Sequence, residues 1–163
     1  MKWFQFYFSL ILINFAHAYE ITMGRILAID YGKKRVGLAV SDPDKIIANN
    51  LTTVPTNSIW DYLHQYFSTE DVETVIIGYP LQMNNTASEA VFFINPFIKK
   101  FREKYPYIHL EQVDERFTSR MAQRTMIEGG LKKMARRNKE LVDSISATII
   151  LQSYMEQLRY KNM

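Results

Sequence analysis

The sequence predicts an α/β fold, with a five-stranded mixed sheet and helices on both of its faces. Two apolar runs, residues 26–29 and 36–40, flank a short basic turn, which is typical of a β-hairpin. Residues 72–77 are apolar and rich in β-branched side chains, as expected of a strand that is covered on both faces. From residue 57 onward, helix-like and strand-like segments alternate, which favours parallel strands joined by crossover helices.

The strands follow from apolar runs that end at turn residues. We expect them at residues 26–29, 36–40, 48–54, 72–77 and 108–113. Pro55 closes the third strand, and Gly78-Tyr79-Pro80 stops the fourth. The first three strands should form an antiparallel meander, and the last two should extend the sheet in parallel.

The helices follow from apolar periodicity and from capping residues. Asn57 or Ser58 is the expected cap of a short helix that continues to about residue 67. A second helix is expected over residues 87–104, bent or interrupted near Pro96. A third should run from Thr118 or Ser119 to the glycines at 129–130, and the last over residues 138–158.

Composition excludes several kinds of site. The chain has 163 residues, of which 47% are hydrophobic, so it can form a globular domain with a real core. It has no cysteine, which rules out disulfides, thiolate metal sites and a cysteine nucleophile. With 3 histidines, any metal should be held mainly by oxygen. The net charge of +3 is a small excess and does not by itself indicate a polyanion partner.

Residues 1–22 form an apolar N-terminal extension with two interpretations. A lysine, a long apolar stretch and the Ala16-His17-Ala18 sequence resemble a secretory signal peptide. Alternatively, Met23-Gly24-Arg25 opens the first strand directly, as a natural start would, and residues 1–22 result from a misplaced start. We favour the misplaced start, and we expect residues 23–160 to form a single domain.

Carboxylates occur where three predicted elements begin or end. Asp30 ends the first strand, Asp114 and Glu115 end the fifth, and Asp143 lies in the first turns of the last helix. Functional groups of α/β sheets gather at the carboxyl ends of parallel strands, so Asp30 and Glu115 could meet there if the first and fifth strands run parallel. Asp143 shares a helix face with Ser146, Ala147 and Ile150, and the small side chains on this face allow close approach to the sheet.

Three clustered carboxylates would repel one another without a cation. Hard divalent cations prefer oxygen ligands, so Mg²⁺ or Mn²⁺ is the expected ion. A pair of such ions roughly 3.5–4 Å apart would suit displacement at phosphorus. There is a simpler interpretation of each acid alone: Asp30 starts a turn, Glu115 pairs with Arg116, and Asp143 is an exposed helix residue. Asp114 is the alternative to Glu115, since only one of two adjacent strand residues points inward.

Four ordered blocks resemble one family. They are residues 30–37 with Ser41-Asp42, Gly78-Tyr79-Pro80 with Met83-Asn84, residues 114–119 with Ala122, and Lys139-x-x-x-Asp143 with Ala147 and residues 150–152. From residue 23 to about 158 the chain therefore resembles the YqgF/RuvX family of Holliday-junction-resolvase-like proteins in the ribonuclease H superfamily. The resemblance implies a ribonuclease H-like fold and a bacterial cytoplasmic nuclease that matures the 5′ end of pre-16S rRNA. Asp30, Glu115 and Asp143 match the acidic positions of the family.

The leading functional hypothesis is a metal-dependent endonuclease for structured RNA. Asp30, Glu115 and Asp143 would be both the catalytic residues and the ligands of Mg²⁺ or Mn²⁺. Phosphate-binding candidates come from two basic segments: Lys34, Arg35 and Arg116, then Lys132, Lys133, Arg136 and Arg137. The alternative for these basic side chains is a solvated surface.

Three other functions remain open from the sequence. The first is a resolvase of Holliday junctions or other branched DNA. The second is a nucleic-acid-binding or ribosome-binding module without turnover, because a fold does not determine activity. The third treats Asp30-x-Gly32 as the phosphate loop of an actin-like ATPase, although such enzymes need two domains and this chain has room for one.

Overall fold

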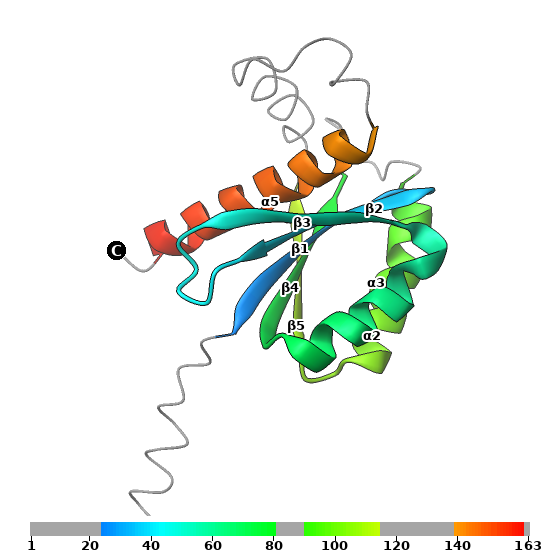
Figure 1. The fold of residues 1–163 in the computed structure, drawn as a ribbon, viewed down its shortest axis with the longest axis horizontal. Helices are drawn as coiled ribbons and strands as arrows, with labels where there is room; N and C mark the ends of the chain where they lie inside the picture. Colours follow the sequence, from blue (N-terminus) through cyan, green and yellow to red (C-terminus); the bar gives the residue numbers. More distant parts are fainter. Residues whose placement is uncertain (1–23, 81–89, 115–138, 162–163) are drawn as a thin grey trace, which may run out of the picture.

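A five-stranded mixed sheet forms the centre of the protein (Figure 1). The computed structural model describes residues 24–80, 90–114 and 139–161. The strands are β1 (Arg25–Tyr31), β2 (Arg35–Ser41), β3 (Ala48–Pro55), β4 (Val72–Tyr79) and β5 (His109–Asp114), in the spatial order β3-β2-β1-β4-β5. β1, β2 and β3 pair antiparallel, whereas β4 pairs parallel with both β1 and β5. The predicted meander with a parallel extension is confirmed.

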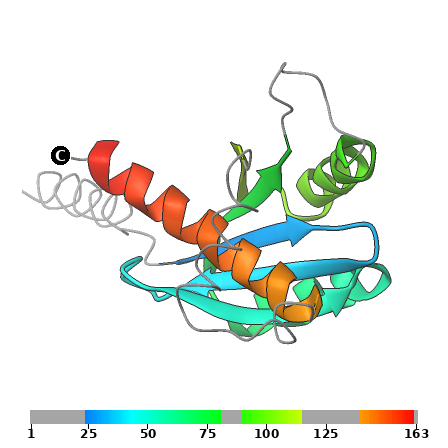
Figure 2. The same ribbon diagram turned by 90° about the horizontal axis from the view of Figure 1, so that it is seen from above.

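Helices cover both faces of the sheet, as the sequence predicts (Figures 1 and 2). The described helices are a short 3₁₀ turn η1 (Thr56–Ser58), α2 (Ile59–Thr69), α3 (Val91–Lys104) and α5 (Lys139–Lys161). α2 and α3 lie on one face, and α5 crosses the other. The helix expected to begin at Thr118 or Ser119 lies outside the described residues.

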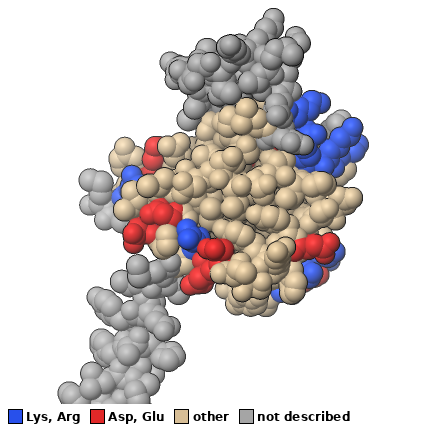
Figure 3. Space-filling model, viewed as in Figure 1, with Lys and Arg blue, Asp and Glu red and all other residues tan. Residues whose placement is uncertain are grey.

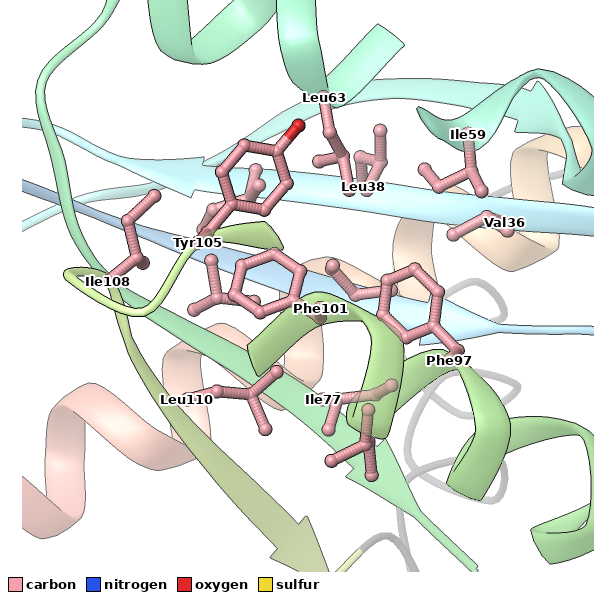
Figure 4. Close-up of a cluster of buried hydrophobic side chains, with 14 of the residues drawn as sticks. Val36, Leu38, Ile59, Leu63, Ile77, Phe97, Phe101, Tyr105, Ile108 and Leu110 are labelled. Carbon is pink, nitrogen blue, oxygen red and sulfur yellow. The ribbon is translucent and has the colours of Figure 1, made fainter. Parts of the chain in front are cut away.

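Alternation along β1 divides the core into two layers. Leu27 and Ile29 join the larger cluster beneath α2 and α3, whereas Ile26 and Ala28 pack against α5. The larger cluster also contains residues of both helices, of β2, β4 and β5, and of the segment between α3 and β5. Ten of its members are labelled in Figure 4: Val36, Leu38, Ile59, Leu63, Ile77, Phe97, Phe101, Tyr105, Ile108 and Leu110. This division assigns every β1 side chain to a face, including that of Asp30.

The cluster under α5 is built partly from small side chains. Ala28 and Ala39 of the sheet and Ala147 of the helix are all fully buried there. Small residues at facing positions let a helix backbone lie close to the strands. The predicted inward face of the last helix, with Ser146 at 8% exposure, Ala147 at 0% and Ile150 at 1%, is confirmed.

The expected cap of α2 and the expected interruption of α3 are not found in the structure. Ser58 makes no side-chain capping hydrogen bond, because the 3₁₀ turn η1 leads the chain into α2 instead. α3 is not interrupted at Pro96, which lies inside the helix, and the alternative, a bend at this point, stays a prediction. Pro96 lacks an N–H, so the carbonyl of Phe92 loses its usual partner, but the buried stripe of Val91, Ile94 and Ile98 continues through this point and holds the helix on the sheet.

The N-terminal extension, residues 1–22, lies outside the described residues, so both interpretations of it stay predictions. Of the helices in the described part of the chain, none is long and apolar enough to cross a membrane.

Candidate active site

Asp30 lies near the carboxyl end of β1, on the face of the sheet that α5 covers. Its position follows from alternation, because Ile26 and Ala28 pack into the cluster under α5 and Asp30 is two residues further along the strand. Across the antiparallel β1–β2 pair, Asp30 stands opposite Gly37. The carboxylate therefore stands beside the point where α5 meets β2.

Gly37 is that meeting point, and it brings Asp143 to the sheet. A Cβ atom added to Gly37 would lie 2.2 Å from the backbone oxygen of Asp143 and 2.5 Å from its carbonyl carbon. Real Cβ atoms do not approach a backbone so closely, so only glycine allows α5 to lie here. Gly37 thus connects the two acids, since it pairs with Asp30 along the sheet and touches Asp143 above it.

Asp30 and Asp143 line one shallow pocket of about 270 Å³, together with Gly32, Lys33, Lys34 and Arg35. Arg35 donates from Nε to Oδ2 of Asp143 at 2.9 Å, and both side chains are 29% exposed. Lys33 and Lys34 are exposed beside the pair. Figure 3 shows Lys and Arg gathered at its upper right, over the end of the sheet where β1 and β2 meet in Figure 1.

The basic turn between β1 and β2 is held by hydrogen bonds from η1, the 3₁₀ turn before α2. The Gly32 amide donates to the Arg35 carbonyl at 2.9 Å, which closes the turn. Thr56 donates from its hydroxyl to the Gly32 carbonyl at 2.8 Å and from its amide to the Lys34 carbonyl at 3.1 Å. These bonds hold the lysines at the rim of the pocket.

Tyr31, the residue after Asp30, packs on the opposite face of the sheet, under α3. Its ring packs on Phe97 of α3, with the ring centroids 4.6 Å apart. Burial raises the pKa of the Tyr31 phenol, so this side chain stays neutral and adds no charge at the end of β1.

Of the two acids expected at the end of β5, Asp114 lies on the face of the sheet opposite to the pocket. Val113 packs into the cluster under α5, so the adjacent Asp114 projects toward the side of α2 and α3. Glu115 lies outside the described residues. So do Arg116, Lys132, Lys133, Arg136 and Arg137 among the predicted phosphate-binding residues.

The chemistry of the described donors fits a hard divalent cation. Asp30 and Asp143 supply carboxylate oxygens to one pocket, and oxygen is the ligand that Mg²⁺ and Mn²⁺ prefer. Within the described ranges, no group of three or more His, Asp or Glu side chains is placed to hold a metal. Asp30 and Asp143 are thus the carboxylates that the described part of the chain places in this pocket.

Sequence reasoning missed two features of this site. Gly37 interrupts the apolar run of β2, and glycine inside a strand is a known signal of close backbone approach, so the sequence did contain the clue. The ion pair between Arg35 and Asp143 had no such clue, because the two residues are far apart in the chain and only the docking of α5 brings them together.

A family model described as "RuvX: Holliday junction resolvase" matches residues 24–157. The chain belongs to the RuvX family. The match contains both acids of the pocket, so the site lies within the RuvX domain. The resemblance found in the sequence is confirmed.

Similar RuvX proteins carry the name "Putative pre-16S rRNA nuclease". The protein of Phocaeicola vulgatus is 58% identical over 138 residues, which cover 85% of this chain and 99% of the relative. The protein of Bacteroides thetaiotaomicron is 56% identical over 138 residues, covering 85% of this chain and 100% of the relative. With the family match, these relatives confirm the predicted class, a hydrolase of the nuclease type.

Two solved structures share the fold of this RuvX chain. Thermus thermophilus RuvC in complex with a Holliday junction substrate has a TM-score of 0.51 and 14% identity, and the match covers 82% of this chain and 96% of RuvC. The yeast mitochondrial Holliday junction resolvase Ydc2 has a TM-score of 0.51 and 14% identity, and the match covers 85% of this chain and 81% of Ydc2. The predicted ribonuclease H-like fold is confirmed, and at this identity the likeness concerns the fold alone.

Proposed function

We propose that this RuvX protein is a divalent-metal-dependent endonuclease that matures the 5′ end of pre-16S rRNA by phosphodiester hydrolysis. One observation carries the proposal: two acids from opposite ends of the chain, Asp30 and Asp143, line a single pocket with a basic rim. The name of the relatives supports pre-16S rRNA as the substrate. Work on ribosomal RNA would place the protein in the cytoplasm.

Asp30, Asp143 and Glu115 would hold Mg²⁺ or Mn²⁺. Glu115 is preferred to Asp114 because β5 turns Asp114 away from α5. A bound cation would stabilise the negative charge that develops on the phosphate during hydrolysis. The chain's own contribution is to hold the two described carboxylates in place, since Asp143 is fixed by the contact with Gly37 and by Arg35.

Basic side chains would supply most of the affinity for RNA. Lys34 is exposed at the rim of the pocket and free to reach a phosphate, whereas Arg35 is engaged with Asp143 and would bind phosphate only by sharing its guanidinium. Arg116, Lys132, Lys133, Arg136 and Arg137 remain candidates from the sequence. Binding through such contacts should weaken steeply with salt.

Branched DNA is the second candidate substrate. The description of the family as a Holliday junction resolvase favours it. The pocket does not discriminate between the two substrates, because carboxylates that hold a cation and lysines that hold phosphates serve either backbone.

Cleavage assays with the purified full chain test the proposal. A pre-16S rRNA fragment with the precursor 5′ end and a four-way DNA junction are each incubated with Mg²⁺, with Mn²⁺ and with excess chelator. We expect cleavage of the RNA that needs the metal. Asp30→Asn and Asp143→Asn keep the shape of each side chain but remove its charge, so cleavage should fall by orders of magnitude while RNA binding survives.

Asp61→Asn is the matched control, since Asp61 is an exposed acid in the first turn of α2 and does not line the pocket. It should cleave like the wild type. Turnover that continues in excess chelator would refute the metal mechanism. Cleavage of the junction but not of the RNA would show that branched DNA, and not pre-16S rRNA, is the substrate. Binding without any cleavage would favour a non-catalytic module.

A further inference from the structure

We propose that Phe92 and Phe93, at the start of α3, form a stacking platform for an unpaired nucleotide next to the cleaved phosphate. The inference rests on the proposed nuclease function and narrows its substrate to nucleic acid that is single-stranded at the cleavage point. Three observations carry it: the exposure of the two rings, their link to the acidic pocket and the rigid anchoring of the helix that carries them.

The two rings are exposed although α3 has a well-formed apolar face. The buried stripe of α3 consists of Val91, Ile94 and Ile98 with the aromatic residues further along the helix. Phe92 and Phe93 fall outside this stripe, and they are 77% and 42% exposed. Large adjacent apolar side chains on a surface commonly mark an interaction site.

Lys33 links this platform to the acidic pocket. Its ammonium group lies 5.4 Å from the centroid of the Phe93 ring, which is within range of a cation–π interaction. Lys33 also lines the pocket that contains Asp30 and Asp143. The Lys33 side chain therefore lies between the Phe93 ring and the acidic pocket, so a nucleotide stacked on Phe93 would be adjacent to a phosphate in the pocket.

The beginning of α3 is anchored to the strand ends that carry the site. Phe97, one turn after Phe93, packs on Tyr31 at the end of β1. The Tyr79 hydroxyl at the end of β4 donates to Oδ1 of Asn95 at 3.2 Å. The platform thus has a fixed position relative to Asp30. Binding of a base therefore costs little conformational entropy of the protein, because the helix that carries the rings is already ordered.

Exposed aromatic rings beside lysines suit an unpaired base better than a duplex. The bases of a duplex are already stacked on one another, so their faces are not available to a protein side chain. An unpaired base offers its face to a ring, while its phosphates are attracted to Lys33 and Lys34. Every base has such a face, so the platform would select for strandedness and not for sequence.

Binding measurements on the full chain in chelator test the platform without cleavage. Fluorescence anisotropy compares a labelled single-stranded oligoribonucleotide with a blunt duplex of the same sequence. Replacing both Phe92 and Phe93 by Ala should weaken single-strand binding about tenfold, within the range that base–aromatic stacking spans. Duplex binding should change less than about twofold, and the salt dependence should stay the same because no charge is removed.

Two further variants separate stacking from general effects. Phe93→Trp in the Phe92→Ala background keeps an aromatic face and should restore part of the single-strand affinity, whereas Phe93→Leu in that background should not. Tyr107→Ala removes a ring that is 76% exposed just before β5, at the opposite end of the sheet, and should leave binding unchanged. Equal losses for single strand and duplex, or no loss at all, would overturn the proposal.

The platform and the nuclease can fail separately. If the phenylalanine variants lose single-strand binding but the wild type never cleaves with metal, the platform stands and the proposed nuclease function fails. If the wild type cleaves with Mg²⁺ or Mn²⁺ but the variants bind like the wild type, the nuclease stands and the platform is refuted. Unchanged melting of the variants shows that any loss of binding does not come from unfolding.

Discussion

Gly37 has no side chain at the point where α5 crosses β2, and that absence determines where Asp143 lies. Gly37→Ala would place a methyl group against the backbone of Asp143, and neither backbone can move without shifting α5. We expect a loss of about 1–3 kcal/mol in the free energy of unfolding, typical of overpacking, and a large loss of cleavage. Urea denaturation and the RNA assay measure the two effects.

Asn50→Ala, at an exposed position of the neighbouring strand β3, is the control for the glycine variant. It should change the free energy of unfolding by less than about 0.5 kcal/mol. A Gly37→Ala protein with wild-type stability and cleavage would show that α5 can move away from β2 while Asp30 and Asp143 keep their positions.

Arg35 places a positive charge on Oδ2 of Asp143, at the position where a cation would gain most from the carboxylate. Arg35→Gln removes this competitor and should raise the affinity for Mn²⁺ about two- to fivefold, because a partly exposed ion pair contributes only about 0.2–1 kcal/mol. Calorimetric titration with Mn²⁺ in the absence of RNA measures the change.

Arg35→Lys keeps the charge and should bind Mn²⁺ like the wild type. Weaker Mn²⁺ binding by Arg35→Gln would mean that the guanidinium chiefly holds Asp143 in place. The sequence could not reveal this pairing, since the same arginine beside two exposed lysines is also what a phosphate-binding turn requires.

At the scale of elements, periodicity predicted the strands well because each is a short apolar run with a clear stop. β4 was expected over residues 72–77 and occupies Val72–Tyr79. The two strands flanking the basic turn were recognised from their apolar runs, and pairing places Asp30 opposite Gly37. Helix starts were less accurate, because a 3₁₀ turn replaced the expected side-chain cap before α2.

The candidate site was predictable in its residue types and only partly in its geometry. Asp30 and Asp143 were expected to converge, and they line one pocket. The sequence alone could not choose between Asp114 and Glu115, because neighbouring strand residues differ only in the face they occupy. A sequence shows that strand side chains alternate between two faces, but not which face a given residue occupies. The packing of Val113 in the cluster under α5 shows this for β5.

The attachment of α5 to the sheet depends partly on Tyr154, and this contribution should depend on pH. Burial and the hydrogen-bonded Glu111 carboxylate on β5 raise the pKa of Tyr154 from 10.0 to about 12. The folded state therefore favours the neutral phenol, so this stabilisation is complete below pH 10 and is lost as the pH rises through about 12. Urea denaturation at pH 8 and pH 11 should show a larger loss of stability for wild type than for Tyr154→Phe.

Tyr160→Phe removes a phenol that is 79% exposed on the same helix and serves as the control. Its loss of stability between the two pH values should equal that of the wild type. An identical loss in Tyr154→Phe would show that this phenol ionises as easily in the folded protein as in the unfolded chain.

At the scale of the whole molecule, the described core should not need residues 1–22. Both large core clusters draw on side chains between Ile26 and Leu158, and the sheet begins at Arg25. A chain that starts at Met23 should therefore fold and show the same midpoint of thermal unfolding as the full chain. Calorimetry of the two proteins measures this, and a markedly lower midpoint for the shorter chain would show that the extension packs on the core.

The contact between Gly37 and Asp143 also has a consequence for the timing of synthesis. All five strands precede α5 along the chain, so a growing polypeptide carries Asp30 and the basic turn well before it carries Asp143. The acidic pocket can close only after α5 has left the ribosome and settled on β2. A nascent chain therefore lacks the complete pocket until translation of the domain is nearly finished.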